Sequence, residues 1–254
     1  MTGKAPPGTA IYESAEALAQ SVAVWVCRQA QASAGPFAVC LCGGSTPRQL
    51  YAALAAVGAR HGFPWAGAHW FWGDERFVPH DHVDSNYRMA HEAMFSRLAV
   101  PQANIHPIPT VGLSARDAAA AYEATLRHFY GGGQLNSGRA LFDITLLGIG
   151  EDGHTASLFP NQSSLDERRR WVLDVKGPNG DPRITLTYPP LESSRKIVFL
   201  ATGIGKRHIL ARVWSGDRSL PAARVHMGSS VHWFLDRAAD PAEGSADGQR
   251  PKRD

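Results

Sequence analysis

The stretch Phe-Ala-Val-Cys-Leu-Cys at Phe37–Cys42, followed at once by Gly-Gly-Ser-Thr-Pro at Gly43–Pro47, decides the fold. A short, continuous apolar run of this kind is typical of a strand that is buried on both faces, as in a parallel sheet. The glycines and the proline after it indicate a tight turn into a helix, which we expect over residues 48–57. The two segments together therefore predict a strand–turn–helix unit of an α/β protein.

The same alternation of strands and helices continues on both sides of this unit. Apolar residues at helical spacing predict a first helix from Ser14 until Gly35-Pro36 ends it. We expect further strands at 69–72, 142–149, 183–187, 197–201 and 231–235, and further helices at 85–98, 114–130 and 206–214. Strands that alternate with helices predict a Rossmann-like, mostly parallel sheet with helices on both faces.

The domain organisation follows from where the composition changes. Neither an internal repeat nor a Pro/Ser-rich linker divides the middle of the chain, so we expect a single catalytic α/β domain over residues 10–237. Residues 1–9 are rich in Pro and Gly and are expected to be flexible. Residues 238–254 are small and charged, and we expect them to form a disordered tail.

Composition and charge exclude several classes of protein. The 254 residues are 44% hydrophobic, which is enough for a sizeable core. The formal net charge of +3 is small, and Arg168–Arg170 is too short a basic run for a nucleic-acid binder. The N-terminal MTGKAPPGTA has no signal-peptide run, and no stretch approaches about 18 consecutive apolar residues. We expect a cytoplasmic protein that binds neither nucleic acid nor membranes.

The cysteines and histidines suggest neither a disulfide framework nor a metal site. Cys40 and Cys42 are two residues apart in the same predicted strand, so they point to one face and are poorly placed to bridge. With Cys27 they are expected to be reduced core residues. The eleven histidines contain no HExxH pattern and no Cys–His zinc spacing, so no metal is expected.

In open α/β sheets, ligands bind beyond the carboxyl ends of the strands, and the turn Gly43–Pro47 lies at such an end. Gly43 and Gly44 let the backbone approach a ligand closely, and Ser45 or Thr46 can cap the next helix. Free backbone N–H groups and the helix dipole then favour an anion such as phosphate. A plain tight turn with an N-cap is an equally open interpretation.

A second polar segment, Gly73–Arg76 (GDER), directly follows the apolar strand HWFW. Three charged residues at the end of a buried strand make Asp74 and Arg76 candidate site residues. The alternative is a solvated loop. The segment continues to Asp84-Ser85-Asn86, where a helix N-terminus is expected.

The third segment, Gly148–Pro160, follows the buried strand FDITLL and contains Asp152 and His154. Histidine changes its charge near neutral pH, so His154 is a natural proton-transfer group, and Asp152 is close enough in sequence to orient it. Three preceding glycines allow a contorted backbone. A purely structural histidine is the alternative.

Two later basic residues are weaker candidates. Arg183 opens the strand RITLT, and Lys206 follows Gly203–Gly205 at the start of a helix. Arginine would bind a phosphate through its fork and lysine as a point charge, although either residue can equally be on the surface. The chain lacks the GxSxG elbow, the Walker A pattern and GxGxxG after the first strand, which disfavours α/β serine hydrolases, P-loop proteins and dinucleotide enzymes.

Together these motifs resemble those of the 6-phosphogluconolactonase family, in the superfamily of glucosamine/galactosamine-6-phosphate isomerases. The matching segments run in the family's order over residues 37–239: LCGGSTPRQLY, FWGDERFVPHDHVDSNYRMA, DITLLGIGEDGHTASLFP, RITLTYPPLESSRKIVFL, GIGKRHIL and VHWFLDRAA. The resemblance implies the sugar-phosphate isomerase/deaminase fold. It also implies a carboxylic ester hydrolase that converts 6-phospho-D-glucono-1,5-lactone to 6-phospho-D-gluconate in the oxidative pentose phosphate pathway. This small sugar phosphate would be the partner, without metal or organic cofactor, for a monomer or small homo-oligomer.

The resemblance also implies roles for individual residues. His154 would act as general base on water, Asp152 would orient it, and Arg76 would stabilise the oxyanion or position the sugar. Asp74 would bind substrate hydroxyls, near Asn86. The substrate phosphate is expected at a set of residues from three segments, namely Gly43, Gly44, Ser45, Thr46, Arg183 and Lys206.

Two alternative functions stay open. A glucosamine-6-phosphate deaminase typically reads DGHIAFNEP where this chain reads DGHTASLFP, so Phe159 stands where the deaminase has a glutamate. The deaminase also usually has an aromatic residue at the position of Arg76. Both differences favour the lactonase. A sugar-phosphate sensor without catalytic activity is the other alternative, and the presence of His154, Asp152 and Arg76 argues against it.

Overall fold

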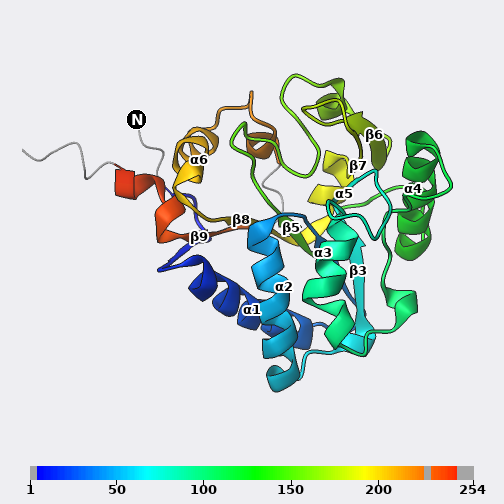
Figure 1. Ribbon diagram of the computed structural model, residues 1–254, viewed down its shortest axis with the longest axis horizontal. Coiled ribbons are helices and arrows are strands. Elements are labelled where there is room, and N and C mark those ends of the chain that lie inside the picture. The colour runs from blue at the N-terminus through cyan, green and yellow to red at the C-terminus, as the bar shows by residue number, and fades with distance from the viewer. Residues whose placement is uncertain (1–4, 226–229, 245–254) are drawn as a thin grey trace, which may run out of the picture.

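The computed structural model describes residues 5–225 and 230–244 (Figure 1). Its larger sheet has the strand order β1-β9-β8-β5-β2-β3, and every neighbouring pair is parallel. The six strands are β1 (Thr9–Tyr12), β2 (Phe37–Leu41), β3 (Ala68–Trp72), β5 (Phe142–Leu147), β8 (Ser194–Ala201) and β9 (Ser230–Asp236). The mostly parallel sheet predicted from the alternating elements is confirmed.

Helices cover both faces of this sheet, as predicted. In β9, Phe234 packs against Trp25 of α1 (Ala15–Gln31) at a ring-centroid distance of 5.4 Å. The preceding residue, Trp233, packs against Trp214 of α6 (Arg207–Trp214) at 5.9 Å. Successive strand residues point to opposite faces, so α1 and α6 lie on opposite sides. The helices are α1 (Ala15–Gln31), α2 (Ser45–His61), α3 (Asn86–Ala93), α4 (Ala115–Tyr130), α5 (Tyr188–Glu192) and α6 (Arg207–Trp214).

A second, three-stranded antiparallel sheet has the order β4-β7-β6. Its strands are β4 (Asp74–Arg76), β6 (Val172–Lys176) and β7 (Pro182–Leu186). The expected strand 183–187 is β7, whereas β4 and β6 were not expected as strands. Gly73 joins the two sheets, because its N–H donates to Leu41 of β2 at 2.8 Å and its carbonyl accepts from Leu186 of β7 at 2.8 Å.

Two predicted helices have wrong boundaries, since the helix expected over 48–57 extends from Ser45 to His61 and the helix expected over 85–98 is shorter. The helix after β2 begins at Ser45, and its N-cap is Gly44, with φ at +114° and no side-chain cap. Ser45 and Thr46 therefore lie inside the first turn and do not cap it; a glycine tolerates this backbone conformation better than either. The helix expected over 85–98 is α3, which ends at Ala93 and is followed by a 3₁₀ turn at Phe95–Arg97.

The segments expected to be loose at both ends are partly structured. Thr9 begins β1 and pairs with Trp233, so the flexible segment expected at 1–9 does not extend through residue 9. Disorder from residue 238 is likewise wrong for residues 238–244, because the 3₁₀ turns η7 (Arg237–Ala239) and η8 (Pro241–Gly244) occur there and Ala239 is buried. Residues 1–4 and 245–254 lie outside the described residues.

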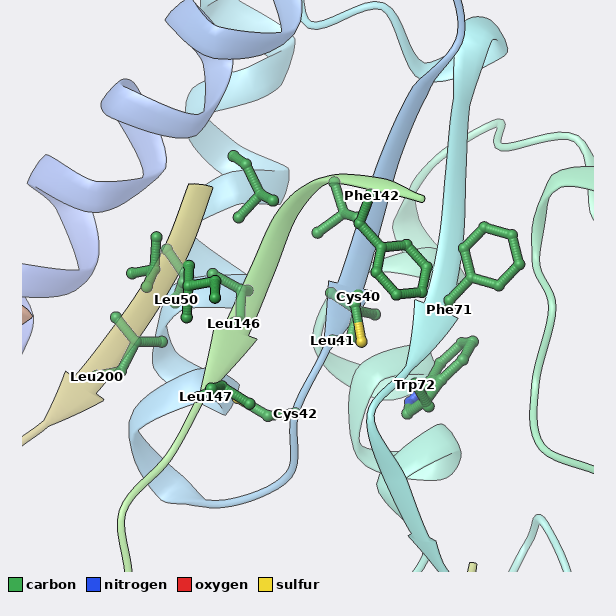
Figure 2. Close-up of a cluster of buried hydrophobic side chains, with 14 of the residues drawn as sticks. Cys40, Leu41, Cys42, Leu50, Phe71, Trp72, Phe142, Leu146, Leu147 and Leu200 are labelled. Carbon is green, nitrogen blue, oxygen red and sulfur yellow. The ribbon is translucent and has the colours of Figure 1, made fainter. Parts of the chain in front are cut away.

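The core surrounds the central strands β2 and β5, which are adjacent (Figure 2). All five residues of β2 are buried, as expected for a strand covered on both faces. Cys27, Cys40 and Cys42 are free and buried, as predicted. From β2 the chain moves outward to β3 on one side, and from β5 it moves outward to β8 and β9 on the other. This reversal makes the carboxyl ends of β2 and β5 the switch point of the sheet, where ligands bind in such folds.

Among the helices of residues 5–225 and 230–244, none has the length and apolar character that a membrane crossing requires.

Candidate active site

Four polar segments meet at the carboxyl edge of the large sheet. They follow β2, β3, β5 and β8. These four strands lie next to one another in the sheet, in the order β8-β5-β2-β3. All four strands run in the same direction, so the segments after them gather at one edge. They are the turn at 43–47, the strand β4, the loop at 148–160 and the turn at 202–206.

The loop after β5 holds His154 and Asp152 in direct contact. His154 Nδ1 lies 2.6 Å from Asp152 Oδ1, which also accepts the backbone N–H of His154 at 3.1 Å. Gly150 permits this conformation, because a side chain there would collide with the His154 ring and the Asp152 carboxylate. Gly153 has a φ of +81°, which favours glycine. The glycines noted in the sequence thus shape this histidine–carboxylate pair.

The hydrogen bond fixes the tautomer of His154. Partial burial opposes ionisation of Asp152, but the backbone N–H, charge and ring of His154 outweigh it and lower the pKa of this carboxyl. An ionised carboxylate only accepts hydrogen bonds, so Nδ1 carries a proton, and in the neutral imidazole Nε2 carries the lone pair. The side chain of His154 is 34% exposed, so solvent reaches it. The ring packs 4.9 Å from that of Phe159, which is an apolar neighbour and not a second carboxylate.

Asp74 is buried and is tied to the His154 loop. Ser157, three residues after His154, donates its hydroxyl to Asp74 Oδ2 at 2.7 Å. The backbone N–H of Ser157 donates to Thr185 Oγ1 at 3.1 Å, and Thr185 lies opposite Asp74 in the β4–β7 pair. One serine therefore links the loop after β5 to both strands of the small sheet. Ala156 beside it has a φ of +47°, a conformation that is uncommon for alanine.

Arg76 and Arg183 are direct cross-strand neighbours in β4 and β7. Their side chains share one face of the small sheet, on the same side as Asp74. Arg76 donates to the backbone carbonyl of Asp84 at 3.0 Å, and its buried Nε has no hydrogen-bond partner among the described residues. Arg183 pairs instead with the carboxylate of Asp181 in the turn between β6 and β7. Two arginine side chains thus start from adjacent positions on one face of the small sheet, and one of them is already paired with a carboxylate.

Asn86 connects the turn after β2 to β4. Its side-chain amide donates to the backbone carbonyl of Asp74 at 3.0 Å, and its carboxamide lies so close to Gly43 that no side chain fits at that position. Asn86 is itself buried at the start of α3. Gly43 is therefore required by this close approach, which brings the predicted anion-binding turn against the predicted acidic segment.

The N-terminus of α2 forms the remaining side of the site. Gly44 and Ser45 are exposed, and Thr46 makes a 2.6 Å hydrogen bond with Thr202 at the end of β8. This bond places the 3₁₀ turn η5 (Ile204–Lys206), which carries Lys206, next to the start of α2. The exposed first turn of the helix and a nearby lysine form a positive end that suits an anion.

Sequence reasoning missed three residues that build this site. Ser157 and Thr202 were assigned no role, and Glu75 was noted only as one of the charges in GDER, although it is 1% exposed and accepts four hydrogen bonds. The one signal for Glu75 in the sequence is its place between Asp74 and Arg76, directly after the buried strand HWFW. Ser157 and Thr202 carry no such signal, since their partners are 83 and 156 residues away.

Over residues 5–225 and 230–244, no cluster of three or more His, Cys, Asp or Glu side chains is arranged to hold a metal ion. The arrangement instead combines a histidine, a buried carboxylate, two arginine side chains and an exposed helix N-terminus. In an α/β protein this combination is suited to binding an anionic ligand and to transferring a proton.

A family model described as glucosamine-6-phosphate isomerases/6-phosphogluconolactonase matches residues 13–233. The chain is 40% identical over 215 residues to a 6-phosphogluconolactonase of Synechocystis sp., covering 83% of this chain and 86% of that protein. It is 36% identical over 249 residues to the 6-phosphogluconolactonase of Rattus norvegicus, covering 94% and 95%. The crystal structure of a 6-phosphogluconolactonase from Thermotoga maritima superposes with a TM-score of 0.75 at 30% identity, covering 90% of this chain and 98% of that one.

The chain therefore belongs to the glucosamine-6-phosphate isomerase/6-phosphogluconolactonase family. Its fold, with the six-stranded parallel sheet, is that of the family's solved structures.

Proposed function

We propose that this protein hydrolyses 6-phospho-D-glucono-1,5-lactone to 6-phospho-D-gluconate, the second step of the oxidative pentose phosphate pathway. The observation that carries the proposal is the pair formed by His154 and Asp152, which leaves Nε2 of the histidine free at the carboxyl ends of β2 and β5. The relatives named 6-phosphogluconolactonase cover most of the chain and support the same reaction.

In the proposed mechanism, His154 Nε2 removes a proton from a water molecule while the water oxygen bonds to the lactone carbonyl carbon. The carbonyl oxygen becomes an oxyanion, which the guanidinium of Arg76 stabilises by charge. The oxyanion then collapses, the bond from the carbonyl carbon to the ring oxygen breaks, and the His154 imidazolium protonates that oxygen. Asp152 holds the ring and stabilises its charged state.

The other site residues would bind the substrate. The phosphate lies at the exposed start of α2, on Gly43, Gly44, Ser45 and Thr46, with Lys206 and Arg183 supplying positive charge. Arg183 must exchange its contact with Asp181 for the phosphate to serve in this way. Asp74 accepts hydrogen bonds from sugar hydroxyls, with Asn86 fixing the backbone beside it. Holding the remote phosphate orients the lactone carbonyl toward His154.

The contact between His154 and Phe159 favours lactone hydrolysis over deamination of an amino sugar. A deaminase would place a glutamate at this position to tune the histidine, but here an apolar ring, 5% exposed, packs against it. Arg76 likewise stands where the deaminase usually has an aromatic residue. The site thus suits a base for water, with an apolar ring where a deaminase would have its glutamate. The reaction as proposed needs neither a metal nor an organic cofactor, and we place it in the cytoplasm, in a monomer or small homo-oligomer.

A coupled assay tests this function. Glucose 6-phosphate is oxidised enzymatically to the lactone, and loss of the lactone is followed above its spontaneous hydrolysis. Glucosamine 6-phosphate is tested in parallel for ammonia release. We expect lactone hydrolysis without ammonia release. Ammonia release without lactone hydrolysis would establish the deaminase instead, and binding of 6-phosphogluconate without either reaction would establish the sensor.

A further inference from the structure

Glu75 points away from the residues to which the mechanism assigns roles. In β4 the side chains of Asp74 and Arg76 lie on one face, and Glu75 lies on the other, opposite Ile184 of β7. It is 1% exposed. In the part of the chain that the structure describes, its carboxylate takes part in no ion pair with Lys, Arg or His. Burying a carboxylate without a nearby cation costs free energy, so hydrogen bonds to Glu75 must offset that cost.

Four donors surround this carboxylate. Oε1 accepts the backbone N–H groups of Arg76 at 2.8 Å and Asn86 at 2.7 Å. Oε2 accepts the backbone N–H of Tyr87 at 2.8 Å and the hydroxyl of Ser85 at 3.1 Å. A carboxylate has about four lone-pair sites, so the four donors saturate it. If a glutamine replaced Glu75, its side-chain N–H group would point at one or more of these backbone N–H groups, and two donors cannot bond to each other.

Three of these donors belong to the start of α3. Asn86 and Tyr87 are the first two residues of the helix, and their N–H groups have no partner within it. Ser85 is the N-cap, and its hydroxyl also accepts the N–H of Arg88 at 3.2 Å. Glu75 therefore caps α3 from a different element, and its negative charge faces the positive end of the helix.

This contact controls where two site residues lie. Asn86 holds the backbone of Asp74 and fills the space beside Gly43. Arg76 donates to the carbonyl of Asp84, which immediately precedes the capped segment. We propose that Glu75 is a positioning residue, whose carboxylate clamps segment 84–88 to β4 and thereby holds Arg76 and Asn86 in the geometry needed for catalysis. The role in catalysis rests on the proposed lactonase function.

The ionisation of Glu75 supports this role. Burial raises its pKa to about 7, although the N–H groups of Asn86, Tyr87 and Arg76 oppose the shift and the charge of Asp74 adds to it. The hydroxyl of Tyr122 in α4, which is electrostatically coupled to Glu75, is already bonded to the backbone of Trp72. A protonated Glu75 no longer offers four acceptor sites to four donors, so the clamp loosens as pH falls below 7.

The test replaces Glu75 by its neutral isostere, Glu75→Gln, and compares it with Asp143→Asn. Asp143 is the matched control, since it also accepts a backbone N–H, from Ala38 at 2.8 Å, but lies at the amino end of β5. In Glu75→Gln, amide exchange in the peptide covering residues 84–93 should be about tenfold faster. Per folded molecule, kcat/KM for the lactone should fall about tenfold. Asp143→Asn should change neither by more than about twofold.

The pH profile separates positioning from a merely structural role. Between about pH 8 and pH 6, wild-type kcat/KM should fall more steeply than that of Glu75→Gln, because the variant has lost one ionisation. Wild-type exchange rates, wild-type kcat/KM or an unchanged slope in Glu75→Gln would overturn the proposal. If this variant does not fold, Ser85→Ala decides: about threefold lower kcat/KM supports the clamp, and a wild-type value contradicts it.

The exchange measurement does not depend on the reaction. If the wild-type protein hydrolyses no lactone, the proposed function fails, while faster exchange at 84–93 in Glu75→Gln still supports the clamp itself.

Discussion

The Oδ1 atom of Asp152 lies 2.6 Å from Nδ1 of His154 and also accepts the backbone N–H of the same histidine at 3.1 Å. Both bonds restrain the imidazole, because they fix its tautomer and the backbone that carries it. The negative charge of Asp152 stabilises the imidazolium that forms when His154 accepts a proton.

Replacing Asp152 by Asn tests that charge. Asparagine keeps an oxygen that can accept both N–H groups, but the imidazolium loses its counter-ion. We expect kcat to fall by about 10- to 100-fold, with KM changed by less than about threefold. Steady-state kinetics of lactone loss measure both quantities. Asp166→Asn is the control, since that carboxylate is 84% exposed. An unchanged kcat in Asp152→Asn would exclude a role for its charge.

Replacing Lys206 by Ala tests the phosphate site. Lys206 would contribute binding common to the ground state and the transition state, so KM should rise by about tenfold or more while kcat stays near the wild-type value. The neighbouring Arg207→Ala is a matched control, because that guanidinium donates to the carbonyl of Ala238 instead. An unchanged KM in Lys206→Ala would remove this lysine from the phosphate site.

Ser157→Ala tests the link between the His154 loop and Asp74. It leaves the buried Asp74 carboxylate without its hydroxyl donor, which should cost about 1.5–3 kcal/mol of unfolding free energy. We also expect kcat/KM to fall about tenfold, since Asp74 is then free to turn. Urea unfolding and steady-state kinetics give the two numbers. Ser96→Ala, at an exposed serine, should have neither effect. Wild-type stability would show that the bond to Asp74 contributes nothing.

The histidine pair at 69 and 106 predicts loss of stability in acid. His106 Nε2 lies 3.1 Å from His69 Nδ1, and burial, followed by the charge of His69, lowers the pKa of His106 to about 4. Below the ordinary pKa of 6.5, His106 takes up a proton in the unfolded chain but not in the folded protein. The contribution of neutral His106 to the free energy of unfolding is therefore complete above pH 6.5 and is lost as pH falls toward 4.

The variant His106→Gln carries no titratable group at this position. Its loss of unfolding free energy between about pH 7 and pH 5 should be roughly 1 kcal/mol smaller than in the wild type, allowing for the partial exposure of the ring. Urea unfolding at the two pH values measures this difference. Equal losses in both proteins would mean that His106 is not responsible.

The large sheet could be predicted because its strands bury both faces. Phe37–Cys42 and the run FDITLL read as buried strands from apolar continuity alone, and the polar segments after them mark the edge of the site. β4 could not be predicted in this way. Its three residues are all charged, and it is a strand only because β7, over a hundred residues later, supplies its partner. Tertiary pairing overrode local preference.

The candidate site, like the fold, could be predicted from the sequence only where the contacts are local. Asp152 and His154 are two residues apart, so their contact follows from sequence spacing. The pairing of Arg183 with Asp181 depends on the turn between β6 and β7, and the capping of α3 by Glu75 depends on how two elements dock. Ser45 and Thr46 have side chains that suit an N-cap, but Gly44, with its positive φ, is the N-cap and the helix begins at Ser45.

His154 is the base that activates water in the proposed mechanism, so its removal is the most direct test. The decisive measurement is kcat for lactone hydrolysis, above the spontaneous rate, in His154→Ala and in His61→Ala, a control at the exposed end of α2. We predict a fall of about 10²- to 10⁴-fold in His154→Ala and none in His61→Ala. A His154→Ala protein with near wild-type kcat would contradict the account.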